Sequence, residues 1–210
     1  MATTQRRQQM IMMTVLLLGS FITTLAETLM NTALPTIMRE LHISQMTAQW
    51  LSTGYMLAAG IMMPTAAYFT NRVKLRPLFI TIMTTFLTGL IISASTSSFT
   101  FLLFGRLIQA LAVGISMPLV QNVITLISPI NKRGLMLGVT GVVINLGPAV
   151  GPTLSGYIVD HYSWRMLFLC LIPLAALALI LGIFLIKNIT PTRPDRLDVP
   201  SLLLSTVGFG

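Results

Sequence analysis

Residues Gly141 to Asp160 read GVVINLGPAVGPTLSGYIVD, an apolar stretch containing glycines and prolines that a water-soluble helix would avoid. Small residues repeat every four positions and form one ridge along a helix: Gly147, Gly151 and Ser155. A neighbouring helix can approach such a ridge backbone to backbone. A second ridge beside it combines two bend-forming prolines with a glycine: Pro148, Pro152 and Gly156. The stretch predicts a membrane-spanning helix that packs closely and bends.

The whole chain has the composition of an integral membrane protein. Hydrophobic residues make up 54% of its 210 residues, and charged residues only 9%. A span of the ~30 Å hydrocarbon core needs about 20 apolar residues. Six runs satisfy this: 10–34, 46–69, 77–96, 99–127, 134–159 and 165–186. We expect an all-α membrane protein with a six-span bundle at 10–186, a polar connector at 187–200 and a truncated seventh span at 201–210.

The basic residues predict the orientation in the membrane. Ten of the thirteen lysines and arginines fall in the amino terminus, the even-numbered loops and the connector. By the positive-inside rule, residues 1–9 and the connector are then cytoplasmic. The net charge of +8 is scattered over short loops, so it indicates topology and no nucleic-acid partner. We expect a multi-pass protein of a bacterial-type plasma membrane, in contact with the lipid bilayer.

Two charged side chains lie inside predicted spans, Glu27 in the first and Arg106 in the fourth. Charges within the membrane are costly and by default mark functional sites. We expect the first helix to break at Pro35, about eight residues after Glu27. The two charges would then lie at similar depths, roughly 12 Å and roughly 10 Å from the outer end of their spans. A structural ion pair, or packing of the arginine against backbone carbonyls, would also explain them.

An internal repeat relates two segments of the chain. AYFTNRVKLRPLF, from Ala67, aligns with GYIVDHYSWRMLF, from Gly156, at an offset of 89 residues, the separation of Arg76 and Arg165. Three predicted spans intervene, and an odd number inverts the second copy in the membrane. Transporters contain inverted three-plus-three repeats of this kind.

Four motifs resemble the major facilitator superfamily, and in particular its EmrB/QacA-type drug:proton antiporters. GPAVGPTLSG resembles the antiporter signature of the fifth span. LAETLMNTALP resembles the first-span motif LDxTIVNVALP, although the family acid aligns with Ala26 and the acid here is Glu27. RLIQALAVGISMP resembles RxxQGxGxxxxxP of the fourth span, and SWRMLFLCLIP resembles SWRWIFxxNxP. The loop after the second span resembles the gating motif GxLaDRxGRrxxL only in part: Arg72 and Arg76 are basic, and Asn71 replaces the aspartate.

The resemblance implies the six-helix amino-terminal bundle of a twelve- or fourteen-span transporter that alternates access to a midplane site. It implies export of small hydrophobic or cationic compounds in exchange for protons, with the proton gradient as energy source and no cofactor or metal. Glu27 and Arg106 would couple protons, Asn31 and Gln109 would line the cavity, and the remaining carboxyl-terminal half would complete the transporter.

Other functions remain open. Close packing alone would explain the small-residue ridge. The same fold could export a specific metabolite, peptide or lipid, or the chain could be a membrane assembly or regulatory subunit that transports nothing. Without a GxxxxGK[ST] loop, we do not expect ATP to drive it directly. Without a visible set of nucleophile and base, we do not expect an enzyme.

Overall fold

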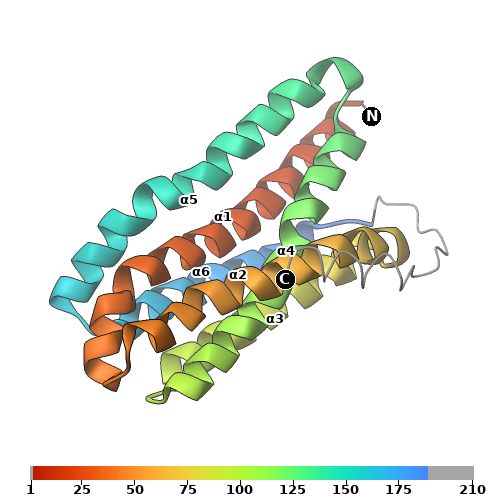
Figure 1. Cartoon of the computed structure of the whole chain (residues 1–210). Helices are drawn as coiled ribbons and strands as arrows, with labels where there is room; N and C mark the ends of the chain where they lie inside the picture. Colours follow the sequence, from red (N-terminus) through yellow and green to blue (C-terminus); the bar gives the residue numbers. More distant parts are fainter. Residues whose placement is uncertain (1, 189–210) are drawn as a thin grey trace.

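The computed structural model describes residues 2–188, with side chains from Arg7 onward, and this part is helical with no strand. It contains six α-helices and one short 3-10 helix (Figure 1): α1 (Ala2–Leu41), α2 (Gln45–Arg72), α3 (Leu75–Ser95), α4 (Phe99–Ile127), η1 (Ile130–Lys132), α5 (Arg133–His161) and α6 (Arg165–Leu185). The predicted seventh span and nearly all of the predicted connector lie outside the described residues.

The helices coincide with the six apolar runs, so the all-α prediction is confirmed. Five of the described helices are long and apolar enough to cross a membrane: α1, α3, α4, α5 and α6. α2 is 28 residues long, which is sufficient length, but it has no membrane-length segment as apolar as those of the other five. Its position between two apolar neighbours in the sequence and its packing along α4 make it part of the same bundle.

The inverted repeat is visible in the helices themselves. A shift of 89 residues places the end of α2, Arg72, on the end of α5, His161. α3 and α6 each have 21 residues, and α2 and α5 have 28 and 29. The packing repeats as well: α1 lies against α5 and α6, just as α4 lies against α2 and α3 (Figure 1). α1–α3 and α4–α6 are therefore two copies of one three-helix unit.

The first helix does not end at Pro35, as we had predicted from the sequence. α1 continues through Pro35 to Leu41 as one helix of 40 residues. A proline lacks only its own N–H, so a single one removes one hydrogen bond and need not stop a helix. Glu27 consequently lies about 21 Å from the end of α1, at 1.5 Å per residue, and not about 12 Å.

Successive helices run in opposite directions, so the turns between them fall alternately at the two ends of the bundle. One end carries the amino terminus and the α2–α3 and α4–α5 turns, together with most of the basic residues, and we call it the basic end (Figure 1). The other end carries the α1–α2, α3–α4 and α5–α6 turns, and we call it the far end. α5 contacts the other described helices along one face only: 22% of its most apolar segment is buried, compared with 56% for α1.

Candidate functional site

Arg106 lies in α4 with its side chain entirely buried. Its Nη1 donates a hydrogen bond of 3.0 Å to Oε1 of Gln109, one turn later on the same helix. Its Cζ lies 3.9 Å from the centre of the Tyr55 ring on α2, a cation–π contact. A buried guanidinium needs such compensation, because removing its hydration is costly. The arginine predicted from the sequence is therefore held by α4 and α2.

Gln109 connects Arg106 to a third helix. Its Nε2 donates a hydrogen bond of 3.0 Å to Oγ of Ser93 on α3. Two glycines allow this close crossing, because a Cβ at Gly89 would lie 2.6 Å from Cγ of Gln109, and a Cβ at Gly105 would lie 2.5 Å from Oγ of Ser93. Gln109 is fully buried and fixes the position of the arginine. Its place in the transport cavity stays a prediction.

Glu27 lies near this cluster without joining it. Its side chain is half-buried on α1 and, among the described residues, makes no hydrogen bond or salt bridge. It is still close enough to Arg106 for the two charges to interact. Ala26, which aligns with the family acid, is 2% exposed in the helical core. Glu27 is thus the acid that remains available beside Arg106.

Asn31 lies one turn beyond Glu27 and contacts α2. Oγ of Ser52 donates a hydrogen bond of 2.6 Å to Oδ1 of Asn31. Asn31 is exposed, so it can also contact a molecule outside the bundle. Its polar group already links α1 to α2 near the level of Glu27.

The small-residue ridge of α5 packs against the segment of α1 that carries Glu27. A Cβ added to Gly147 would lie 3.1 Å from the backbone nitrogen of Leu25, and one added to Gly151 would collide with Oγ1 of Thr28. Oγ of Ser155 donates a hydrogen bond of 2.7 Å to the carbonyl of Leu29. The ridge therefore contacts α1 over residues 25–29, both before and after Glu27 in the sequence.

The second ridge of α5 does not pack against the described helices. Pro148 and Pro152 are exposed, and a Cβ on Gly156 would meet nothing within 4 Å. α5 nevertheless stays one continuous helix through both prolines. The antiporter-like motif thus has one face bound to α1 and one face free.

The residues of the predicted gating loop lie at the basic end. Nη1 of Arg72 donates a hydrogen bond to the hydroxyl of Tyr68, and its guanidinium lies 5.6 Å from the centre of that ring. The backbone N–H of Arg76 donates to Oδ1 of Asn188 at 3.1 Å. Asn71 lies in the last turn of α2. The contacts of Arg72 and Arg76 involve neither Arg106 nor its partners Gln109 and Tyr55.

A pocket of about 420 Å³ also opens at the basic end, between α1, the end of α4 and the start of α5. It is mainly apolar, and its lining includes Met10, Met13, Leu17, Met136 and Lys132. None of the predicted site residues lines it. Leu17 lies about 15 Å from Glu27 along α1, at 1.5 Å per residue.

The sequence did not reveal two residues of the cluster around Arg106: Ser93, which binds Gln109, and Tyr55, whose ring faces Arg106. A serine in an apolar span has many structural explanations, and only the packing of α3 on α4 shows its role. Among the described residues, no three histidine, cysteine or acidic side chains are grouped as metal ligands. Cys170 is a free, exposed thiol.

The comparison with protein families matches residues 16–208 to the model described as Major Facilitator Superfamily. The chain belongs to this superfamily. Lincomycin resistance protein LmrB of Bacillus subtilis (strain 168) is 41% identical over 206 residues, which cover 98% of this chain and 43% of LmrB. Probable multidrug resistance protein EmrY of Escherichia coli (strain K12) is 31% identical, over 92% of this chain and 38% of EmrY.

Relatives with another cargo also match. Riboflavin transporter RibZ of Clostridioides difficile (strain 630) is 29% identical over 94% of this chain and 44% of RibZ. The crystal structure of a POT family transporter in complex with 5-aminolevulinic acid superposes with a TM-score of 0.75 at 18% identity, over 93% of this chain and 43% of that one. This structure confirms the fold as that of a transporter bundle. The chain spans about two fifths of the length of these relatives.

Proposed function

We propose that this chain is the amino-terminal bundle of a drug:proton antiporter that exports small hydrophobic or cationic compounds across a bacterial plasma membrane, with its amino terminus in the cytoplasm. A second bundle, as in the longer relatives, would complete the transporter. The observation that carries the proposal is the placement of Glu27. It lies within electrostatic reach of the buried Arg106 without an ion pair, on the segment of α1 that the antiporter-like ridge of α5 contacts.

The arrangement supports an exchange of positive charges at Glu27. Arg106 is permanently charged and is fixed by Gln109 and Tyr55, so it supplies a constant positive field. Glu27 can then carry either a proton or a nearby cationic compound, and the two compete for one carboxylate. Such competition is the basis of antiport, because the same midplane site opens to each side of the membrane in turn and is loaded with one or the other.

The α5 ridge would transmit the motion. Because Gly147, Gly151 and Ser155 contact the backbone of α1 around Glu27, α1 and α5 must move together. The free ridge and the exposed apolar residues of α5 would face the second bundle as the two halves rock. In this account the proline–glycine pattern lets α5 follow α1 without losing its contacts.

A second candidate is export of one specific metabolite by the same fold, and the similarity to the riboflavin transporter RibZ favours it. The test uses cells that overexpress the complete gene product and are loaded with a cationic dye. We expect dye efflux that stops when an uncoupler collapses the proton gradient. Efflux that survives the uncoupler would contradict antiport. Dye efflux that only one class of metabolite inhibits would favour the second candidate.

A further inference from the structure

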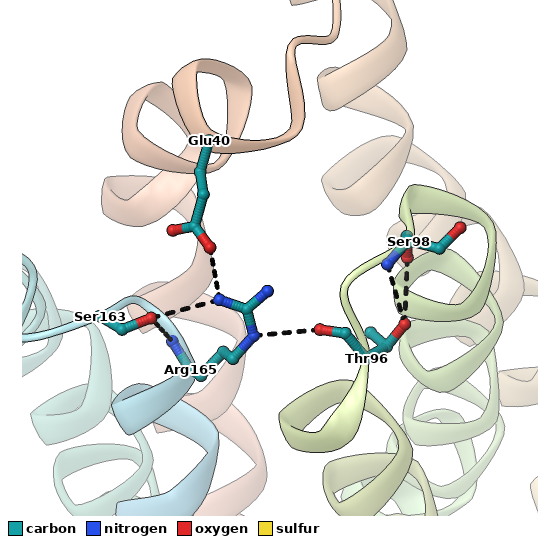
Figure 2. Close-up of polar contacts among 5 residues, drawn as sticks. All are labelled: Glu40, Thr96, Ser98, Ser163 and Arg165. Carbon is teal, nitrogen blue, oxygen red and sulfur yellow. Dashed lines mark hydrogen bonds and ion pairs between the residues drawn. The ribbon is translucent and has the colours of Figure 1, made fainter.

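Arg165 joins the end of α1 to the α3–α4 and α5–α6 turns at the far end of the bundle (Figure 2). It lies at the start of α6, and its Nη1 forms a salt bridge with Oε1 of Glu40, in the last turn of α1. Its Nε donates a hydrogen bond of 3.1 Å to the carbonyl of Thr96, in the α3–α4 turn. Its Nη1 also lies 3.4 Å from Oγ of Ser163. We call Glu40, Thr96, Ser163 and Arg165 the far-end clamp.

The ring of Trp164, which is buried, packs against the guanidinium of Arg165 in the clamp. Cζ of Arg165 lies 4.3 Å from the centre of the Trp164 ring, and Trp164 is fully buried. Trp164 in turn packs edge-on against Phe168, with ring centres 6.1 Å apart. The planar guanidinium is thus fixed on one face by an aromatic ring and at its edge by a carboxylate and a carbonyl. Its orientation is set by several contacts at once.

The inverted repeat places a simpler contact at the basic end. Arg76 corresponds to Arg165, and there the backbone N–H of Arg76 contacts Asn188, just after α6. Arg76 lies at the start of α3 and contacts Asn188, which follows α6. In the same way, Arg165 lies at the start of α6 and contacts Thr96, which follows α3. Among the described residues, only the far-end copy includes an ion pair to α1, the helix that carries Glu27.

The clamp therefore fixes the end of a helix whose position matters for Glu27. Glu40 is thirteen residues after Glu27 on the continuous helix α1, about 20 Å along its axis. A small change of tilt at the clamped end moves the carboxylate of Glu27 relative to Arg106. The side chains of Arg165 and Glu40 are 25% and 41% exposed, and ion pairs this exposed contribute little to folding free energy. Their effect is on position.

We propose that Glu40 and Arg165 are positioning residues: they anchor the far end of α1 to the α3–α4 and α5–α6 turns and so hold Glu27 in place beside Arg106. The anchoring follows from the contacts of the clamp alone. Its consequence for transport rests on the proposed function.

The anchoring is tested by cysteine accessibility in the purified chain. Ile37 lies one turn before Glu40 and is fully buried. In a Cys170→Ser background, Ile37→Cys should react slowly with a water-soluble maleimide. Adding Glu40→Gln or Arg165→Gln should accelerate labelling at least fivefold, and the double variant should react no faster than the faster single one, because both remove the same contact. Asp160→Asn, an exposed acid at the same end, is the matched control and should change nothing.

Unchanged labelling in both single variants, or accelerations that multiply in the double variant, would overturn the anchoring. The transport arm uses dye efflux by the complete gene product carrying the same substitutions. We expect a lower maximal rate with an unchanged half-saturating dye concentration, and partial recovery with Glu40→Asp. Faster labelling with an unchanged efflux rate would overturn the positioning role. Absence of efflux in the unmodified protein would overturn the proposed function and leave the anchoring to be judged by labelling.

Discussion

Arg106 shows how a permanent charge is accommodated within the bundle. Among the described residues it has no carboxylate within ion-pair distance. Instead it has the face of Tyr55 and the amide oxygen of Gln109. A desolvated cation–π contact is worth about 2 kcal/mol, and a hydrogen bond to a charged group about 1.5–3 kcal/mol. These contacts hold the guanidinium in place while leaving Glu27 free of a direct ion pair.

Replacing Gln109 should therefore loosen the arginine. Gln109→Ala removes the acceptor for Arg106 and the donor for Ser93, both of which are buried, so it should lower the free energy of unfolding by about 1.5–3 kcal/mol. The measurement is chemical unfolding of the purified chain in detergent. Gln121→Ala, at an exposed glutamine of the same helix, is the control and should stay within about 0.5 kcal/mol of the parent. Equal stability of both variants would contradict the role given to Gln109.

The sequence was a good guide to single residues where a charge or amide is unusual in an apolar run. Arg106 and Glu27 could be identified in this way, because charges in a membrane are rare. The partners could not be identified. Ser93 and Tyr55 are ordinary residues of their helices, and Glu40 and Arg165 are separated by 125 positions, so only the packed structure pairs them.

At the scale of helices, α5 has two ridges with different roles. The four-residue spacing predicted both from the sequence, but not which of them would contact α1. In the structure the ridge of Gly147, Gly151 and Ser155 is buried, and the ridge with the two prolines is exposed. The packing partner decides this, and no partner is visible in a helical pattern alone.

The two ridges give a matched pair of substitutions. Gly151→Ala should place a methyl group against Thr28 and lower the free energy of unfolding by about 1–3 kcal/mol, the usual effect of overpacking. Gly156→Ala points into open space and should leave the stability of this chain unchanged or slightly higher. Thermal unfolding of the two purified variants tests this. A greater loss for Gly156→Ala than for Gly151→Ala would refute the assignment of the ridges.

The ends of helices were predicted less well than their existence. The apolar runs predicted six helices, and the structure has them, but α1 extends past Pro35 to Leu41. Proline removes a hydrogen bond without dictating that the chain must turn. The turn comes at His42, the one described non-glycine residue with a positive φ, 50°. Such a turn has no strong signal in the residue types around it.

The whole bundle was the most predictable level. Its composition indicated a membrane protein, and the offset of 89 residues predicted the inverted repeat that the helix packing shows. Most basic residues lie in the amino terminus and in every second turn, and these meet at one end of the bundle because successive helices alternate in direction. Composition, charge distribution and an internal repeat depend on many residues, so a wrong interpretation of one residue does not change the prediction made from them.

The orientation in the membrane gives a prediction at this scale. Met46 at the far end and Ile130 at the basic end are 79% and 82% exposed. In a Cys170→Ser background, a membrane-impermeant maleimide added to intact cells should label Met46→Cys and not Ile130→Cys, because the positive-inside rule places the basic end in the cytoplasm. Labelling of Ile130→Cys should require permeabilised cells. The reverse pattern would show that the predicted orientation is wrong.

The central claim is that Glu27 couples a proton gradient to export. The most direct measurement uses the complete gene product in inverted membrane vesicles, acidified inside, with a cationic dye added outside. We predict dye uptake by the parent protein and by the control Asp160→Asn, and loss of gradient-driven uptake in Glu27→Gln with normal membrane insertion. Gradient-driven uptake by Glu27→Gln at the parental rate would contradict the account, because the carboxylate could then not be the proton carrier.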